Sequence, residues 1–221
     1  MGSLQNIKAV TFDVGGTLMK PFPSVGHVYA EVAARHGKNI PAAVLNQRFA
    51  KAWRGLKHFS HGREEWSALV DQAFAGLWQM PPDGSFFSEL YDRFSEPDAW
   101  QVFDDVRPAL DSLAARGINL GIISNWDERL RPLLARLGLA EYFETIIISC
   151  EVGFTKPSPV IFEQAAKRLG LAPKFILHVG DSVQHDVAGA KGAGYGALLL
   201  ERGAEDVTEG TIRSLGALEE M

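Results

Sequence analysis

The hydrophobic positions divide the chain into two parts with different periodicities. In the second half, short apolar and β-branched runs alternate with segments whose apolar residues recur every three or four positions. The runs predict buried strands, and the periodic segments predict amphipathic helices, several of them ended by glycine. Strands are predicted at residues 8–13, 117–125, 144–149, 174–181 and 194–200, and helices at 104–117, 127–138, 158–170 and 183–194. This alternation predicts an α/β fold with a parallel sheet and helices on both faces.

The segment from about residue 21 to 103 does not alternate in this way. It reads as four helices separated by proline- and glycine-containing breakers, with no strand between the first one and about residue 117. A helical block inserted after the first strand predicts a separate all-α, lid-like domain at residues 21–103. The core domain would then comprise residues 1–20 and 104–221. In the core, the tail after residue 200 predicts a short helix with a loosely held end.

Composition narrows the class of protein. With 221 residues, 46% of them hydrophobic, the chain can bury a substantial core and is typical of a soluble globular protein. A formal charge of −5 and the lack of a polybasic run argue against nucleic-acid binding. The single Cys150 excludes an internal disulfide framework, and no stretch has the length of a membrane span or the pattern of a signal peptide. We therefore expect a cytoplasmic protein without a nucleic-acid or membrane partner. A monomer or a homodimer is expected, without a signal in the composition that decides between them.

Polar side chains stand where the predicted strands end. Asp13 follows the first strand, Ser124 and Asn125 follow the second, and Asp181 follows the fourth, while Lys156 lies between the third strand and a helix. Ligands of such sheets bind at the carboxyl ends of the strands. We therefore expect a carboxylate nucleophile, a hydroxyl, a lysine and a second acid on one edge of the sheet. Read singly, each residue has a plainer interpretation, as a cap of a turn or helix or as a surface lysine.

Four segments in order, "FDVGGTL", "ISN", "TKPSP" and "GDSVQHD", resemble the four motifs of the haloacid dehalogenase (HAD) superfamily. The helical block after the first motif resembles the cap of that superfamily. "DVGGTL" with "ISNWDERL" is most similar to the REG-2-like branch of its phosphatase-type hydrolases, and the resemblance spans about residues 8–200. It implies a Rossmann-like HAD core with an inserted cap and hydrolysis of a small phosphorylated metabolite.

The resemblance also implies roles for individual residues. Asp13 would attack phosphorus and form an aspartyl-phosphate, which splits one difficult step into two. A carboxylate repels a phosphate dianion, so a cation is needed, and Mg²⁺ prefers oxygen ligands. The ligands implied are Asp13, Asp181, the backbone carbonyl of Gly15 and, through water, Asp186.

Other side chains would contact the phosphate. Ser124, Asn125 and Thr17 would bind it, with Thr17 also supporting the loop after Asp13. Lys156 would both bind the substrate and act as a catalytic residue, because its charge can neutralise the charge that grows on the phosphate oxygens.

The first motif departs from the phosphatase pattern. Phosphatases of the superfamily typically carry a second aspartate that protonates the leaving group, and Gly15 stands there. Three explanations are open. In the first, a group on the cap substitutes, with candidates His27, His58, His61, Glu64 and Glu65. In the second, the leaving group needs little protonation, as in acyl or aryl phosphates. In the third, catalysis is vestigial, in a regulatory protein that binds a phosphorylated ligand.

Related branches offer further alternatives. 2-Haloacid dehalogenases also lack the second acid, but they typically carry a tyrosine at the position of Gly15 and need no metal-binding pair. Phosphonoacetaldehyde hydrolase carries a small residue there and uses a cap lysine as a Schiff base, for which Lys51 and Lys57 are candidates. Because "GDSVQHD" retains both acids, the sequence favours Mg²⁺ and phosphate over halide.

Overall fold

The computed structural model describes residues 6–56, 59–205 and 208–219. Lys57 and His58, two of the cap candidates, lie outside the described residues. Among the described residues, every helix is too short or too polar to span a lipid bilayer.

The chain folds into two compact units. The first, here called the core unit, comprises Met1–Met19 and Val102–Met221, and the second, the helical unit, comprises Lys20–Gln101. Each limit differs by one or two residues from the boundary predicted for the two domains.

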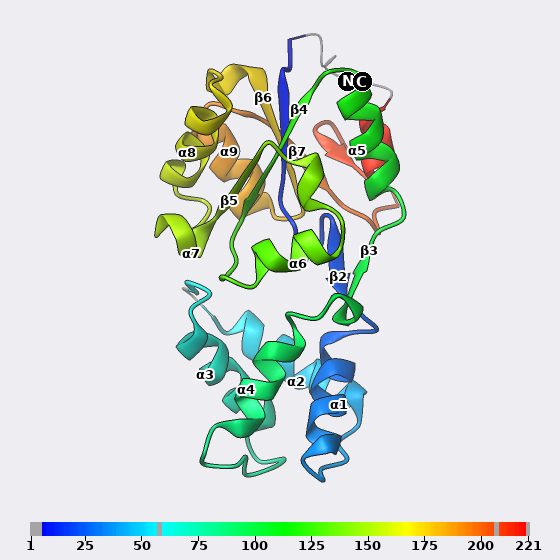
Figure 1. Cartoon of the computed structure of the whole chain (residues 1–221), viewed down its shortest axis with the longest axis vertical. Helices are drawn as coiled ribbons and strands as arrows, with labels where there is room; N and C mark the ends of the chain where they lie inside the picture. The colour runs from blue at the N-terminus through cyan, green and yellow to red at the C-terminus, as the bar shows by residue number, and fades with distance from the viewer. Residues whose placement is uncertain (1–5, 57–58, 206–207, 220–221) are drawn as a thin grey trace. The chain divides into compact units, whose positions relative to one another are not determined.

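A six-stranded sheet forms the centre of the core unit, and all of its strands are parallel (Figure 1). In spatial order they are β5 (Thr145–Ile148), β4 (Asn119–Ser124), β1 (Ala9–Phe12), β6 (Ile176–Gly180), β7 (Gly196–Leu200) and β8 (Thr211–Ile212). The strands β1, β5 and β6 are buried throughout, as expected where helices cover both faces of a parallel sheet. The Rossmann-like parallel sheet predicted from the sequence is thereby confirmed.

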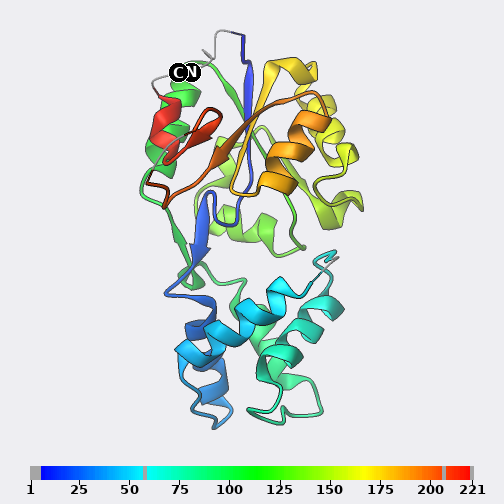
Figure 2. The same cartoon turned by 180° about the vertical axis from the view of Figure 1, so that it is seen from behind.

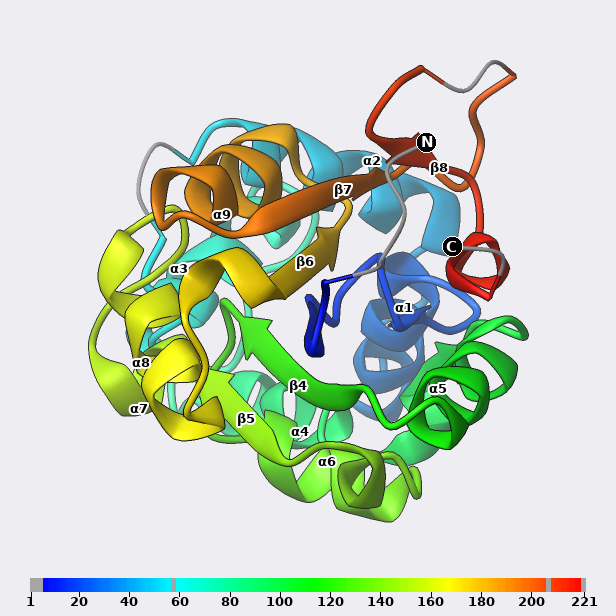
Figure 3. The ribbon, with the colours of Figure 1, turned by 90° about the horizontal axis from the view of Figure 1, so that it is seen from above.

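Helices cover both faces of this sheet, with α8 and α9 on one face and α5 and α6 on the other (Figure 3). The chain moves outward from β1 through β4 to β5 and then crosses back to β6 and β7, so right-handed crossovers place the two helix pairs on opposite faces. The helical segments are α5 (Val106–Ala115), α6 (Leu130–Arg136), η2 (Ala140–Tyr142), α7 (Ser149–Val152), α8 (Pro159–Leu169), η3 (Pro173–Phe175), η4 (Val183–Ala188), α9 (Gly189–Gly192) and η5 (Leu215–Leu218). Of these, η4 is a π-helical turn, where the sequence predicts an ordinary helix over 183–194.

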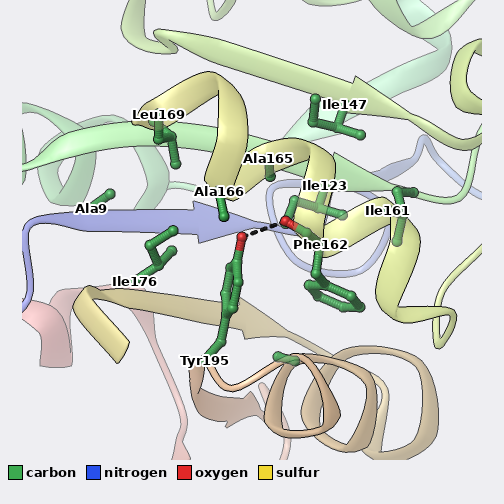
Figure 4. Close-up of a cluster of buried hydrophobic side chains, with 11 residues drawn as sticks. Ala9, Ile123, Ile147, Ile161, Phe162, Ala165, Ala166, Leu169, Ile176 and Tyr195 are labelled. Carbon is green, nitrogen blue, oxygen red and sulfur yellow. Dashed lines mark hydrogen bonds between the residues drawn. The ribbon is translucent and has the colours of Figure 1, made fainter. Parts of the chain in front are cut away.

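The face covered by α8 shows why this segment is helical. Its buried residues Ile161, Phe162 and Ala165 recur at helical spacing and pack against residues of the central strands, such as Ile123 (Figure 4). The hydroxyl of Tyr195 donates a 2.6 Å hydrogen bond to the Phe162 carbonyl, which satisfies the polar group of a buried ring. This layer holds β1, β4 and β6 in register and so fixes where their carboxyl ends lie.

In the described part of the helical unit the chain forms four α-helices, as predicted. They are α1 (Val25–Arg35), α2 (Ala42–Arg54), α3 (Arg63–Phe74) and α4 (Ser85–Arg93), followed by the one-turn η1 (Pro97–Ala99). Their apolar faces meet in a core rich in aromatic residues, where the ring centroids of Phe74 and Phe86 lie 5.0 Å apart and those of Tyr29 and Phe74 lie 5.7 Å apart. Many of the cap aromatic residues therefore pack against one another.

Two short strands correct the expectation that no strand lies between the first one and about residue 117. Strand β2 (Met19–Pro21) pairs with β3 (Trp100–Val102) in a sheet of their own, where the chain leaves and re-enters the core unit. Each strand has three residues, and β2 contains a lysine and a proline. Such short segments carry no usable hydrophobic alternation.

The tail also differs from its prediction. It forms the edge strand β8, parallel to β7, before the single turn η5, and it returns beside α5 (Figure 2). The carboxylate of Asp105 holds it there by accepting hydrogen bonds from the Ser214 hydroxyl at 2.7 Å and the Leu215 amide at 2.8 Å.

Candidate active site

The carboxylate of Asp13 is contacted by one side chain from the end of β4 and one from the segment between α7 and α8. Its backbone amide donates to the Val179 carbonyl at 2.9 Å, so the residue directly after β1 is still held by the sheet. One carboxylate oxygen, Oδ1, accepts hydrogen bonds from Ser124 Oγ at 3.0 Å and from Lys156 Nζ at 2.7 Å. The structure thus brings Asp13, Ser124 and Lys156 together at one edge of the sheet.

Lys156 lies between two carboxylates. Its ammonium donates to Asp13 Oδ1 at 2.7 Å and to Asp186 Oδ1 at 2.6 Å, and only 3% of the residue is exposed. Burial by itself lowers the pKa of a lysine, but the charges of Asp13 and Asp186 outweigh it and raise the pKa of Lys156 above its ordinary value. The side chain therefore stays charged and is not a surface lysine.

Asn125 makes a contact that the sequence did not predict. Its Oδ1 accepts a 2.6 Å hydrogen bond from the Lys156 amide, and its Nδ2 donates to the Lys156 carbonyl at 3.1 Å. This pair of bonds fixes the backbone from which the lysine side chain extends. The contact of Asn125 with a substrate stays a prediction.

Three carboxylates gather at this edge. Oxygen atoms of Asp13, Asp181 and Asp186 all lie within 4.8 Å of one another. Asp181 lies close to the turn after Asp13. The turn allows this approach because residue 16 is a glycine, with φ +80°; a β-carbon there would lie 2.1 Å from Asp181 Oδ2. Although Asp181 is exposed, the loss of water around its carboxyl group and the charges of Asp13 and Asp186 raise the pKa of Asp181 to about 7. Like charges are thus held together at some cost.

This donor set fits a hard divalent cation. Lys156 can neutralise only one of the three negative charges, and all the remaining donors are oxygen atoms, which Mg²⁺ prefers. The Gly15 carbonyl accepts none of the hydrogen bonds that close the turn after Asp13. Asp186 is already committed to other donors, because Oδ1 accepts from Lys156 and Oδ2 accepts from the Ser182 amide at 2.9 Å.

Thr17 belongs to the turn that closes behind Asp13. The Leu18 and Met19 amides both donate to the Val14 carbonyl, at 2.8 and 3.1 Å. Thr17 is fully buried, and within the described chain its hydroxyl has no hydrogen-bond partner. Its carbonyl accepts a 2.7 Å hydrogen bond from Arg202 Nη2. The contacts of Thr17 are those of a residue that supports the loop.

A layer of residues behind these side chains was not predicted from the sequence. His178, in β6, is fully buried and its Nε2 lies 3.1 Å from Asp186 Oδ1. Its Nδ1 lies 2.9 Å from Thr11 Oγ1, in β1. The one available signal was a histidine and a threonine inside otherwise apolar strands. Arg202 had no signal, because its partner Thr17 lies 185 positions away.

Three of the cap candidates for the missing acid, His27, His61 and Glu65, contact neighbours within the helical unit. His27 Nδ1 lies 2.8 Å from Ser24 Oγ, and Glu65 accepts hydrogen bonds from the Ser60 and Gly62 amides at the start of α3. Glu64 and Lys51 are exposed. His61 packs against Phe59, with ring centroids 4.7 Å apart.

Comparison of the sequence with known proteins identifies the family of the chain. The family described as haloacid dehalogenase-like hydrolase matches residues 7–194. The chain belongs to this family. It is 34% identical over 205 residues to human haloacid dehalogenase-like hydrolase domain-containing protein 3, covering 88% of this chain and 82% of that protein. It is 29% identical to the rhythmically expressed gene 2 protein of Drosophila melanogaster over 90% and 85% of the two chains. It is also 31% identical to phosphoglycolate phosphatase of Salmonella typhi over 88% and 81%. The resemblance to the REG-2-like branch is thus confirmed, and the protein is an HAD-type hydrolase.

Solved structures extend the comparison. An HAD phosphatase from Thermococcus onnurineus is 28% identical, with a TM-score of 0.71 over 97% of both chains. A 2-haloacid dehalogenase from Pseudomonas syringae is 25% identical, with a TM-score of 0.67 over 97% of both chains. The putative HAD hydrolase YfnB from Bacillus subtilis, bound to magnesium, shares the fold, with 20% identity and a TM-score of 0.77 over 97% of this chain and 98% of that chain.

Proposed function

We propose that this HAD-type hydrolase is a Mg²⁺-dependent phosphohydrolase that acts on small phosphate esters or acyl phosphates. One observation carries the proposal: the Asp13 carboxylate accepts hydrogen bonds from Ser124 and Lys156 and has two further carboxylates within 4.8 Å. A phosphatase needs a nucleophile, donors for the phosphate oxygens and a cation site in one place. Relatives named phosphoglycolate phosphatase and HAD phosphatase support the same class.

Mg²⁺ would be held by Asp13, Asp181, the Gly15 carbonyl and, through water, Asp186, and when bound it would neutralise charge between the carboxylates and the phosphate. Asp13 would attack phosphorus and carry the phosphoryl group as an aspartyl-phosphate until water removes it. Ser124, Thr17 and Lys156 would hold the phosphate oxygens, and Asn125 would keep Lys156 in place. A cytoplasmic location and a monomeric or homodimeric state are part of the proposal.

Gly15 favours phosphates whose leaving group needs little protonation. A positioned acid or base typically contributes about 10²–10⁴-fold to a rate. Without a side chain at position 15 able to transfer a proton, alkyl phosphates should turn over slowly. The leaving groups of acyl and aryl phosphates, a carboxylate and a phenolate, are weak bases that need little protonation. Acyl and aryl phosphates should therefore be the better substrates. A protein that binds a phosphorylated ligand and hydrolyses it poorly is the alternative.

The test compares acetyl phosphate and p-nitrophenyl phosphate with and without Mg²⁺. We expect hydrolysis that requires Mg²⁺ and is abolished in Asp13→Asn. Asp111→Asn is the matched control, because it removes an exposed carboxylate of α5 that contacts Tyr142. Unchanged hydrolysis in Asp13→Asn would contradict the proposed nucleophile. Mg²⁺-dependent phosphate binding without turnover would favour the binding protein.

The likeness to a 2-haloacid dehalogenase provides a second enzyme candidate. Halide needs no proton on leaving, which agrees with Gly15. The cluster of Asp13, Asp181 and Asp186 argues against it, because halide displacement needs no cation. Chloride release from 2-chloropropionate in the presence of a chelator would support the dehalogenase instead.

A further inference from the structure

Behind the three carboxylates runs a chain of buried hydrogen bonds. Thr11 and His178 are directly opposite each other in the paired strands β1 and β6, and neither has any exposed surface. From His178 the series of hydrogen bonds continues to Asp186, then to Lys156 and finally to Asp13, over distances of 3.1, 2.6 and 2.7 Å. A residue remote from solvent is thereby connected to the proposed nucleophile.

The partners of His178 determine which of its nitrogens carries a proton. Both carboxylate oxygens of Asp186 already act as acceptors, since Oδ1 accepts from the Lys156 ammonium at 2.6 Å and Oδ2 accepts from the Ser182 amide at 2.9 Å, and a carboxylate with this role can only accept from His178. The Nε2 atom of His178 must therefore carry a hydrogen and donate it to Asp186 Oδ1. The Thr11 hydroxyl lies closer to Nδ1, at 2.9 Å, than to the Leu177 carbonyl, at 3.4 Å, and holds the other side of the ring.

The Asp186 carboxylate is fixed from three directions. Oδ1 accepts from His178 and Lys156, and Oδ2 accepts from the Ser182 amide. Gly180 allows this close approach, because a β-carbon there would lie 2.1 Å from Asp186 Cγ. The orientation of the carboxylate sets where the Lys156 ammonium lies, because the ammonium donates to both Asp186 and Asp13.

We propose that His178 is a positioning residue, whose Nε2–H group orients Asp186 so that Asp186 holds Lys156 against Asp13. The catalytic part of this inference rests on the proposed function, whereas its effect on the carboxylate cluster does not. A histidine that only filled space beside Phe162, whose ring centroid is 5.3 Å away, would need no N–H group in this place. The donor group is therefore what an experiment must vary.

Glutamine and asparagine separate the two nitrogens. In His178→Gln the amide nitrogen can occupy the place of Nε2 and still donate to Asp186. In His178→Asn the shorter side chain reaches only the place of Nδ1, near Thr11. Both variants put an amide of similar polarity into the same buried site, so a role in packing or polarity alone predicts similar losses.

The first readout is Mg²⁺ affinity, measured by isothermal titration calorimetry without substrate. Removing a hydrogen-bond partner of a ligating group typically costs about 10–100-fold in metal affinity or activity. We expect a loss of that size in His178→Asn and a loss of at most about threefold in His178→Gln. The kcat for acetyl phosphate should follow the same order. Equal effects in the two variants, large or small, would overturn the proposal.

A second measurement needs no variant. Long-range ¹H–¹⁵N correlation spectra of the ¹⁵N-labelled wild-type protein report which ring nitrogen of His178 carries hydrogen. We expect a protonated Nε2, and an unprotonated Nε2 would overturn the proposal. If the wild-type protein hydrolysed neither phosphate, the proposed function would fail, yet the spectra and the calorimetry would still decide the role of His178.

Discussion

The indole ring of Trp126 borders the backbone of Gly15: a β-carbon at position 15 would lie 3.3 Å from Trp126 Cζ3. The backbone of Trp126 is fixed on both sides by the Ser149 hydroxyl, which accepts from its amide and donates to its carbonyl, each at 3.0 Å. Gly15 is not among the glycines with positive φ, so its backbone does not forbid a larger residue. The indole is thus the nearest obstacle to a side chain at this position.

Restoring an acid should therefore require room beside it. We expect Gly15→Asp alone to give little gain in hydrolysis of an alkyl phosphate such as glycerol 2-phosphate, because the new side chain meets the indole. Gly15→Asp combined with Trp126→Ala should raise kcat/KM by about 10-fold or more, within the range of a positioned acid. Trp126→Ala alone is the control. A full gain in Gly15→Asp alone would show that Trp126 does not obstruct the acid.

Lys156 should stabilise the fold as well as the site. We expect Lys156→Met to lower the free energy of unfolding by about 3–5 kcal/mol in the presence of a chelator, because it leaves buried Asp13 and Asp186 without their shared cation. Urea denaturation measures this loss. Added Mg²⁺ should restore part of it by neutralising the same carboxylates. Lys167→Met, at an exposed position of α8, is the control and should change little. Equal stability of the two variants would contradict the prediction.

A methyl group at position 180 should displace the carboxylate of Asp186. We expect Gly180→Ala to destabilise the protein by about 1–3 kcal/mol, because the new carbon would overlap the carboxylate of Asp186. Gly192→Ala is a matched control at the end of the short helix α9, where a β-carbon would meet nothing within 4 Å and alanine has the higher helix propensity. Thermal unfolding should move in opposite directions for the two variants. A neutral Gly180→Ala would show that Asp186 is free to shift.

The anchor of the tail should be sensitive to acid. Burial alone raises the pKa of Asp105, but Arg202, Ser214 and the Leu215 amide outweigh it and lower the pKa below its ordinary value. A carboxyl whose pKa is lower in the folded state stabilises the fold above its unfolded-state pKa, and this contribution is lost as the pH falls through the folded-state value. We therefore expect Asp105→Asn to cost about 1–2 kcal/mol at pH 7, from the loss of charged hydrogen bonds at a partly exposed site.

The pH profile is the check on this assignment. The stability difference between the wild-type protein and Asp105→Asn should shrink as the pH falls below about 4, where the carboxyl begins to be protonated in the unfolded chain. The neighbouring, exposed Asp104→Asn should give a small and nearly pH-independent difference. A stability difference for Asp105→Asn that grew in acid would contradict the lowered pKa of Asp105.

Local signals explain what the sequence predicted well. Strands such as Ala9–Phe12 and Ile176–Gly180 are buried on both faces and bounded by polar residues, so their composition alone marks them. The proximity of Asp13, Ser124, Lys156 and Asp181 followed from the rule that parallel strands share their carboxyl edge. The predictions at these positions needed no knowledge of side-chain packing.

Non-local contacts explain what the sequence could not predict. The hydrogen bond from Arg202 to Thr17 and the one between Thr11 and His178 depend on pairings between distant segments. The π-helical turn η4 is equally invisible, because its extra residue per turn changes the hydrophobic spacing too little over six residues to be recognised. These features include the contacts that orient the predicted catalytic groups.

The hydrogen bond from Arg202 to the Thr17 carbonyl has a practical consequence for protein engineering. A shortened version of the chain that stops after β7 would keep every residue of the four motifs and still lose a support of the nucleophile turn. Low activity in such a version would say nothing about the catalytic groups themselves. Affinity tags and fusion partners at this end should therefore be joined by a flexible spacer placed beyond η5.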